Sequence, residues 1–520
     1  MIKVLISSAV FVLGSCFVKA QTKNIHELDQ KYLNWYNLDS QNDQILGASV
    51  DKAYNDFLKA RLPKKTIIVA VIDGGVDINH DDLKDNIWVN EKEIPGNNID
   101  DDQNGYIDDI HGWNFIGNTN GENIHYENLE YTRIVKSTST DPDFQKAKQY
   151  YDKELAKRVK EKEGLANFEN VLREAKAIIK EYAGIEISSR NDLSKIQSSN
   201  PQVVKAKNFL ESRYSQGFTE KGLADYKKHV ADYIDYYLNL GFSPRSIVGD
   251  DPHNIDNKPY GNADVKGPRA EHGTAVAGVI AAARNNNIGI NGIAPNVKIM
   301  CIRSTPSGDE RDKDVALAIR YAVDNGAQII NMSFGKDFSP QKKLVDEAVK
   351  HAEKNNVLMV HASGNDGQDL AMYPSFPTSK YLDGSEATNW ITVGASSATK
   401  GDETAAKFSN YHAKYVDIFA PGVNVISLDT TNTYNMNDGT SLAAPVVSGV
   451  AALVWSYYPE LSTTDLIQIL YKSSLKLGKL KVLIPDLENP KRKKVKFNML
   501  SESGGIVNAY EALRMAEKSR

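Results

Sequence analysis

Cysteine is nearly absent from this chain of 520 residues. Only Cys16 and Cys301 occur, and Cys16 falls in an N-terminal segment that has the pattern of an export signal, so a disulfide within the mature protein is excluded. Cys301 lies in the apolar run 297–303, where nothing nearby would lower its thiol pKa, and we expect it to be buried and unreactive. An exported chain without disulfides must be stabilised in another way, and bound calcium is one candidate.

Net charge and long apolar runs are also scarce. The chain has 62 basic and 67 acidic residues, a formal net charge of -5 and a pI near 6.1, which give no sign of a nucleic-acid binder. We expect no transmembrane span and find no tandem repeat in the sequence. With 41% hydrophobic and 25% charged residues, the composition is that of a globular protein of two or three domains.

The first 20 residues have the pattern of a secretory signal. Lys3 precedes the apolar run 4–18, and Val18-x-Ala20 indicates a cleavage site after Ala20. We therefore predict a signal peptide at 1–20 and an exported protein, periplasmic or extracellular. The alternative is a lipoprotein signal ending at Cys16, which would become the lipidated, membrane-anchored first residue.

Alternating strand and helix patterns predict an α/β fold. The apolar run 66–72 ends at Asp73 and two glycines, as a buried parallel strand does. Helices of about a dozen residues alternate with further strands after residue 245, which favours a parallel sheet with helices on both faces. The expected strands are 297–303, 328–332, 357–361, 390–394 and 416–419, and the expected helices are 271–283, 312–326, 340–355, 462–471 and 507–517.

A long, charged and helical stretch interrupts this pattern between residues 126 and 249. Apolar residues recur there at helical spacing, and few strand signals occur. We divide the chain into the signal peptide 1–20, an N-terminal lead-in 21–62 with one helix near 50–62, the first part of the α/β domain 63–125, an all-helical insertion 126–249, and the second part 250–520.

An oxygen-rich loop follows the first strand. Five of its residues match positions 1, 3, 5, 6 and 9 of an EF-hand loop: Asp100, Asp102, Asn104, Gly105 and Asp108. His111 stands where that loop needs a bidentate Glu, so an EF-hand is not expected. We predict a structural calcium site with Asp100, Asp102, Asn104 and Asp108 as ligands; the alternative is a solvated acidic turn.

Ser441 stands at the start of a second buried element. It lies within Gly439–Pro445, and residues 446–455 are nearly all small or apolar, which predicts a helix buried on all sides. Two interpretations fit a serine there. It is an N-cap, or it is a nucleophile whose backbone N–H and helix dipole face a developing negative charge.

A base and an acid for such a nucleophile are also present. His272 opens a helix of small residues, and Asp73 ends the first strand. Each alone has an ordinary structural interpretation, as a helix-opening residue and as a turn-forming acid. Together they supply the base, the orienting acid and the hydroxyl that acyl transfer requires.

These motifs resemble those of the subtilisin-like serine peptidases. Asp73-Gly-Gly, His272-Gly-Thr-Ala-Val-Ala-Gly and Gly-Thr-Ser441-Leu-Ala-Ala-Pro occur in the order Asp, His, Ser that is typical of that family. The resemblance covers roughly residues 60–120 and 245–515 and implies a subtilisin-like sheet. It implies that Ser441 attacks the scissile carbonyl, that His272 moves the proton and that Asp73 orients the imidazole.

The same resemblance extends to substrate binding. The segment ending in Gly364-Asn365 is similar to the one whose Asn completes the oxyanion hole, so Asn365 is the expected fourth catalytic residue. The expected substrate-binding residues, which hold the peptide backbone or wall the pocket before the cut, are Ser333, Phe334, Gly335, Ala362, Ser363 and Gly364.

The chain also departs from the family pattern. Gly74 replaces a usual Ser or Thr, which removes a hydroxyl beside Asp73 and predicts a less rigid triad; Ala275 replaces a frequent His. The insertion is expected either to flank the cleft or to lie on the far rim. The lead-in is short for the family's inhibitory pro-domain.

The sequence thus predicts an exported serine endopeptidase acting on proteins or peptides through an acyl-enzyme, with no cofactor needed for the chemistry. Two rival hypotheses remain: a silent module that binds peptides without cutting them, and a calcium-stabilised structural protein of the cell envelope.

Overall fold

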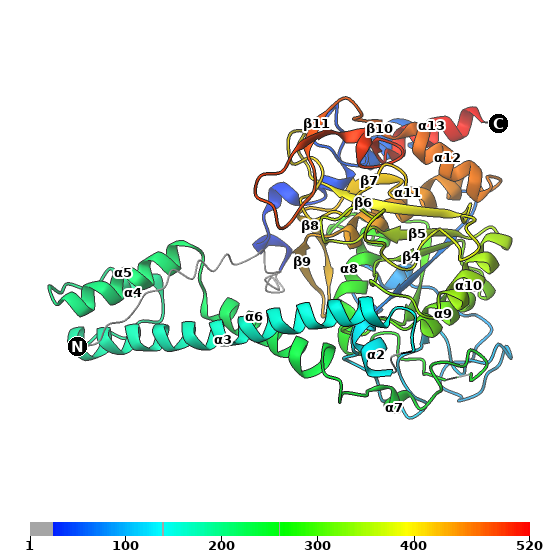
Figure 1. The fold of residues 1–520 in the computed structure, drawn as a ribbon. Coiled ribbons are helices and arrows are strands. Elements are labelled where there is room, and N and C mark those ends of the chain that lie inside the picture. Colours follow the sequence, from blue (N-terminus) through cyan, green and yellow to red (C-terminus); the bar gives the residue numbers. More distant parts are fainter. Residues whose placement is uncertain (1–23, 138–139, 259, 520) are drawn as a thin grey trace. The chain divides into compact units, whose positions relative to one another are not determined.

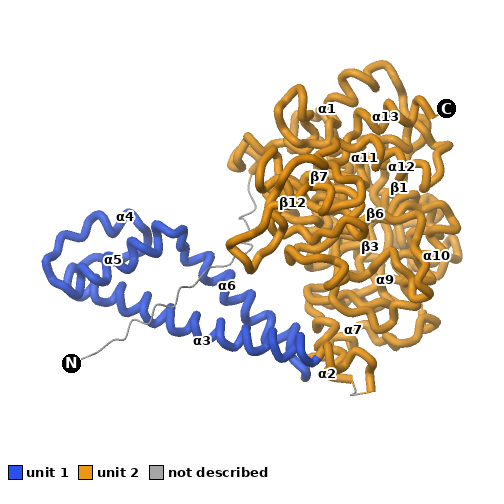
Figure 2. The backbone as a smooth tube through the Cα atoms, turned by 45° about the horizontal axis from the view of Figure 1, so that its top comes forward, with its two compact units in different colours: residues 1–20, 148–240 blue, residues 21–147, 241–520 orange. Residues whose placement is uncertain are grey.

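The computed structural model describes residues 24–137, 140–258 and 260–519. Two compact units divide these residues, as Figure 2 shows. The smaller unit is Lys148–Leu240 and the larger unit takes the rest, so both ends of the expected insertion belong to the larger unit. The predicted signal peptide, with Cys16, lies outside the described residues.

A mainly parallel sheet forms the centre of the larger unit (Figure 1). The described residues form the strands β1 (Ile67–Asp73), β2 (Gly112–Asn114), β3 (Val297–Arg303), β4 (Ile329–Met332), β5 (Leu358–Ala362), β6 (Trp390–Ser396), β7 (Ile418–Pro421), β8 (Val425–Asp429), β9 (Thr433–Asn437), β10 (Leu475–Lys476), β11 (Lys481–Leu483), β12 (Lys494–Lys496) and β13 (Gly505–Ile506). The main sheet has the order β10-β13-β7-β6-β5-β4-β1-β3-β2, and only its β10–β13 pair is antiparallel. The predicted α/β class with a parallel sheet is confirmed.

Helices cover both faces of the sheet. The described residues form the helices α1 (Val50–Lys52), α2 (Glu130–Ser137), α3 (Phe144–Ala183), α4 (Arg190–Leu193), α5 (Pro201–Ser215), α6 (Glu220–Asp232), α7 (Arg245–Val248), α8 (Ala270–Ala281), α9 (Asp312–Asp324), α10 (Lys342–Lys354), α11 (Thr440–Tyr457), α12 (Thr463–Ser473) and α13 (Ala509–Lys518). Alternate residues of β1 enter two cores: Val69 and Val71 pack with α8 and α11, whereas Ala70 and Ile72 pack with α9 and α10. This period of two explains the unbroken apolar run in the sequence.

The strand order reverses at β1. β3 pairs with one side of β1, and β4 pairs with the other side. In open parallel sheets, ligands bind beyond the carboxyl ends of the strands at such a switch point. Asp73 is the last residue of β1 and Ser333 follows β4, so both stand at this edge.

α11 is the central helix of the larger unit. Of the helices in the described residues, it alone is long and apolar enough to cross a bilayer, and 94% of it is buried inside the protein. It packs against α8 and against the strands β4 to β7. A helix that is apolar on all sides is stable where protein surrounds it.

The smaller unit has its own apolar core. Leu172, Ala175 and Ile179 of α3 pack against Leu193 of α4 and Leu210 of α5. Nearer the start of α3, Arg158 lies over the Tyr233 ring, with its guanidinium carbon 3.7 Å from the ring centroid. Because these contacts all lie within Lys148–Leu240, the unit is a helical domain in its own right.

The lead-in is part of the main core. Trp35 and Tyr36 are fully buried, and the Trp35 indole N–H donates to the Asn424 carbonyl at 3.1 Å. The helix expected near 50–62 is shorter than predicted. It consists of α1 and a π-helix at Ala53–Phe57 that directly follows α1. Short turns carry no apolar periodicity, so the sequence did not show that this segment is buried.

Candidate active site

Asp73 is held at the end of β1 by the neighbouring strand. Its carbonyl accepts hydrogen bonds from the N–H groups of Ser304 and Thr305, at 3.1 and 3.3 Å. Its carboxylate Oδ1 accepts the N–H of Gly74 at 2.7 Å. The side chain is 3% exposed, so little water competes for the carboxylate oxygens.

His272 faces this carboxylate from the first turn of α8. Its Nδ1–H donates to both Asp73 oxygens at 2.9 Å, which fixes the tautomer and leaves Nε2 on the far side of the ring as the acceptor. Gly273 makes the approach possible, because a Cβ there would lie 2.2 Å from the Gly75 carbonyl oxygen. Burial lowers the pKa of His272, but the charge and hydrogen bond of Asp73 outweigh it and raise the pKa above its ordinary value of 6.5.

Ser441 is the second residue of α11, and Gly439 takes the N-cap position without a side-chain cap. The Ser441 hydroxyl donates to the Ser333 carbonyl at 3.3 Å, and the Ser333 hydroxyl donates to the Ser441 carbonyl at 2.9 Å. The N-cap interpretation of Ser441 is therefore wrong, because its hydroxyl does not bond a backbone N–H of its own helix.

The sheet register links the serine to the acid. Ile72 pairs with Met332, so the next residues, Asp73 and Ser333, leave neighbouring strands at the same level. Parallel strands lie about 4.8 Å apart, which brings Ser441, bonded to Ser333, to the edge that carries Asp73. Among the described residues, the hydrogen-bond acceptor of the Ser441 hydroxyl is the Ser333 carbonyl and not the His272 ring.

Asn365 is oriented by Thr440, the residue before the serine. Its Oδ1 accepts both the Thr440 N–H and the Thr440 hydroxyl, each at 2.9 Å. A backbone N–H can only donate, so this contact settles which end of the carboxamide is oxygen. The Nδ2 donors of Asn365 have no hydrogen-bond partner among the described residues and remain able to bind an oxyanion.

The expected substrate-binding residues lie at the end of β5 or directly after β4 and β5. The carbonyl of Phe334 accepts Nε2–H of His361 at 2.8 Å, and burial lowers the pKa of His361 to about 4, so this ring is neutral. Gly364 has a φ of +100° and its N–H donates to the Thr440 hydroxyl at 3.2 Å. The two strand ends thus reach Ser441 and its helix from either side.

The comparisons with known proteins agree with this geometry. A sequence model described as the subtilase family matches residues 64–498. The chain belongs to the subtilase family. Asp73, His272 and Ser441 all fall within the matched residues.

Parts of this chain are similar in sequence to known bacterial proteases. The thermophilic serine proteinase of Bacillus sp. (strain AK1) is 39% identical over 186 residues, which cover 36% of this chain and 42% of that protein. Alkaline elastase YaB of Bacillus sp. (strain YaB) is 35% identical over 267 residues, covering 51% and 62%. Subtilisin Savinase of Lederbergia lenta is 38% identical over 208 residues, covering 40% and 71%. The chain spans about half the length of the first two relatives.

This subtilase has supporting residues that sequence reasoning missed. The Ser448 hydroxyl donates to Oδ1 of Asn331 at 2.8 Å, and Nδ2 of Asn331 donates to the Ser333 hydroxyl at 2.9 Å, so a buried chain of bonds runs from α11 to Ser333. Asn410 donates from Nδ2 to the Ser363 carbonyl at 3.0 Å. Asn331 was visible in the motif before Ser333; Asn410 carries no local signal, because its partner lies 47 positions away.

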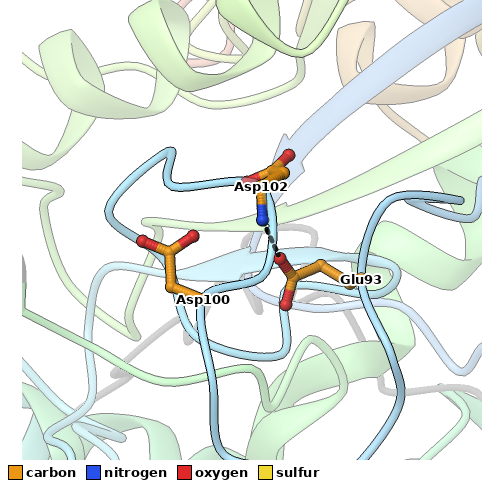
Figure 3. A group of neighbouring side chains, drawn as sticks. All are labelled: Glu93, Asp100 and Asp102. Carbon is orange, nitrogen blue, oxygen red and sulfur yellow. Dashed lines mark hydrogen bonds between the residues drawn. The ribbon is translucent and has the colours of Figure 1, made fainter.

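The oxygen-rich loop brings together a different set of carboxylates from the one expected. Glu93, Asp100 and Asp102 each offer an oxygen within 4.8 Å of the others (Figure 3). The carboxylate of Asp108 instead accepts the N–H groups of Gly96 and Asn98, at 2.8 and 2.9 Å, and is not in this group.

Other polar side chains in and beside that loop have hydrogen-bond partners of their own. Nδ2 of Asn104 donates to Asp109 at 3.0 Å, and Nδ1–H of His111 donates to the Trp88 carbonyl at 2.9 Å. Glu93 accepts the N–H of Asp101 at 2.9 Å and that of Asp102 at 3.1 Å. Sequence reasoning missed Glu93 because it lies outside the spacing of the EF-hand pattern.

Proposed function

We propose that this subtilase is a serine endopeptidase with Ser441 as nucleophile, His272 as general base and acid, Asp73 as orienting acid and Asn365 as oxyanion donor. The observation that carries the proposal is the Nδ1–H of His272 bonded to both oxygens of the buried Asp73 carboxylate. That pair leaves Nε2 as a base and stabilises the imidazolium that forms when it takes a proton. Asn365, held by Thr440, supplies the second half of the machinery.

The reaction follows from these contacts. The Ser441 hydroxyl leaves the Ser333 carbonyl and turns to Nε2 of His272, its oxygen bonds to the scissile carbonyl carbon, and its proton passes to Nε2. Nδ2 of Asn365 and the N–H of Ser441 donate to the oxyanion. The C–N bond then breaks as the imidazolium returns the proton to the leaving amine. In the second half of the reaction, water attacks the acyl-enzyme while His272 takes its proton, and His272 returns that proton to the Ser441 oxygen as the acid is released.

Protein or peptide segments are the proposed substrates. Ser333, Phe334 and Gly335 would pair with an extended peptide, and Ala362, Ser363 and Gly364 would wall the pocket for the residue before the cut. Gly335 leaves little spare room at this position, since a Cβ there would lie 2.4 Å from the Ser375 hydroxyl oxygen. A larger residue at 335 would therefore require the Ser375 hydroxyl to turn away.

Labelling with a fluorophosphonate probe tests this function. The wild-type chain should be modified at Ser441, and Ser441→Ala and His272→Ala should lose the label and peptide hydrolysis. Asn365→Ala should still label but hydrolyse about 100- to 1,000-fold more slowly, the cost of one oxyanion donor. Equal labelling of the wild type and the two triad variants would contradict the proposal. A wild type that binds peptides yet neither labels nor cuts would favour the silent binding module.

We further propose export of this protein, supported by the charged start and apolar run of residues 1–20. Mass spectrometry of the N-terminus after expression in a bacterial host tests it. A mature chain beginning at Gln21 is expected, whereas a lipid-modified Cys16 would establish the membrane-anchored alternative.

A structural calcium ion is proposed at Glu93, Asp100 and Asp102. Three carboxylates that converge within 4.8 Å supply the hard oxygen donors that calcium prefers. The same carboxylates also hold one loop together by hydrogen bonds, among them the one that the N–H of Gly105 donates to Asp100 at 2.8 Å. The ion would neutralise the carboxylates and fix the loop, and no step of the hydrolysis needs it.

A further inference from the structure

Arg303 is a fully buried cation beside the proposed catalytic acid. It is the last residue of β3 and is the register partner of Asp73 in β1. Its side chain is 0% exposed. Burial lowers the pKa of Arg303 to about 10, against the opposing charge of Asp264, so the guanidinium keeps its charge at neutral pH. Burying a charge is costly, so its contacts need an explanation.

The guanidinium binds the segment that follows Asp73. Its Nε–H donates to the carbonyl of Gly74 at 2.9 Å. The N–H of the same glycine donates to the Asp73 carboxylate at 2.7 Å. Both ends of residue 74 are therefore fixed, although glycine would otherwise be the freest residue of the chain.

The same guanidinium also binds the segment that precedes α8, the helix that contains His272. Nη1–H donates to the Asp264 carbonyl at 3.3 Å and to the Asn123 side chain at 3.1 Å. A Cβ at Gly267 would lie 2.1 Å from the guanidinium carbon, so only glycine lets this segment lie against it. Residue 267 is five positions before His272, and α8 begins between them.

We propose that Arg303 is a positioning residue that holds the Asp73–Gly74 turn and the entry to α8 in one arrangement, so that the Asp73 carboxylate meets Nδ1 of His272. The inference rests on the endopeptidase function proposed above. It also accounts for the glycine at 74. A Cβ there would lie 3.0 and 3.1 Å from the carbonyl oxygens of Arg269 and Thr305, so a hydroxyl-bearing side chain has little room, and Arg303 orders the turn from the backbone side.

Kinetics of three variants test the inference. Arg303→Lys keeps the charge but loses the planar fork, and Arg303→Met keeps most of the volume without the charge. Both should lower kcat roughly 10- to 100-fold with KM within about twofold, less than the loss of about 10,000-fold known for a triad acid changed to its amide. Arg303→Ala assayed with added guanidinium ion should recover part of the lost kcat.

The pH dependence of kcat/KM gives a second test, because a residue that only stabilises the fold would leave the acid limb unchanged. Loosening the Asp73–His272 pair weakens the interaction that raises the pKa of His272. The acid limb of kcat/KM should therefore shift to lower pH in both Arg303→Lys and Arg303→Met. Cys301→Ala is the matched control, because it changes a buried side chain on the same strand without touching the Asp73 turn.

The outcomes separate this inference from the proposed function. An inactive wild type would overturn the function itself. An active wild type whose folded Arg303 variants keep the wild-type kcat and acid limb would overturn the inference alone. If the Arg303 variants lose activity only in proportion to their unfolded fraction, as the Cys301→Ala control does, the inference is also overturned.

Discussion

At the scale of single residues, the protonation of His272 controls the proposed chemistry. Burial favours the neutral ring, whereas the charge of Asp73 and, more weakly, that of Glu271 favour the imidazolium; Arg269 acts in the opposite direction. The balance raises the pKa of His272. Because the general base must be neutral, activity should be lost on the acid side at a pH above 6.5.

Glu271→Gln gives a direct test of this balance. Removing a negative charge that raises the pKa of His272 should move the acid limb of kcat/KM to lower pH. A pH–rate profile at two salt concentrations measures the shift, which should shrink at high salt. An acid limb that moves to higher pH would show that the sign assigned to Glu271 is wrong.

At the scale of secondary-structure elements, the sequence predicted those strands and helices that have a strong local pattern. The apolar run at 66–72 became β1, and the small-residue helix expected at 271–283 became α8, because each pattern has the period of its element. Glu93 was missed because a carboxylate cluster depends on loop closure, which leaves no periodic trace. The same limit applies to Arg303, whose role depends on the register of β1 against β3.

The oxygen-rich loop gives a testable prediction for one such element. If calcium binds Glu93, Asp100 and Asp102, a chelator should lower the melting temperature by several degrees, since a ligand at 1,000 times its Kd stabilises by about 4 kcal/mol. Asp100→Asn should abolish the chelator effect. Asp256→Asn, an exposed acid outside the loop, should retain it. A melting temperature unchanged by chelator would leave these residues as a hydrogen-bonded turn.

At the scale of the whole molecule, chain segments that are remote in sequence close the core. The N–H of Ala509 donates to the Ala48 carbonyl at 2.8 Å, and Arg61 pairs with Glu517 at 2.7 Å. The lead-in thus packs beside α13, although the sequence predicted an extended lead-in with one helix near 50–62. No pattern could have shown this, because the contact joins residues some 460 positions apart and depends on the finished fold.

Trp35 gives the measurable consequence of that packing. Trp35→Ala should lower the free energy of unfolding by about 3–5 kcal/mol, because it empties a fully buried site and leaves the Asn424 carbonyl unpaired. Leu62→Ala, in the same lead-in but 86% exposed, should change it by less than about 0.5 kcal/mol. Denaturant unfolding of both variants measures the difference. Equal stability of Trp35→Ala and the wild type would mean that the lead-in is not part of the core.

The bond between Ala48 and Ala509 also sets the order of events during synthesis. During synthesis the Ala48 carbonyl lacks this partner until the segment that forms α13 has been made. Contacts of such long sequence separation form late and slowly. Until α13 is in place, α1 therefore lacks one of the helices that it packs against. The lead-in thus completes its packing only after the segment that forms α13 has emerged from the ribosome.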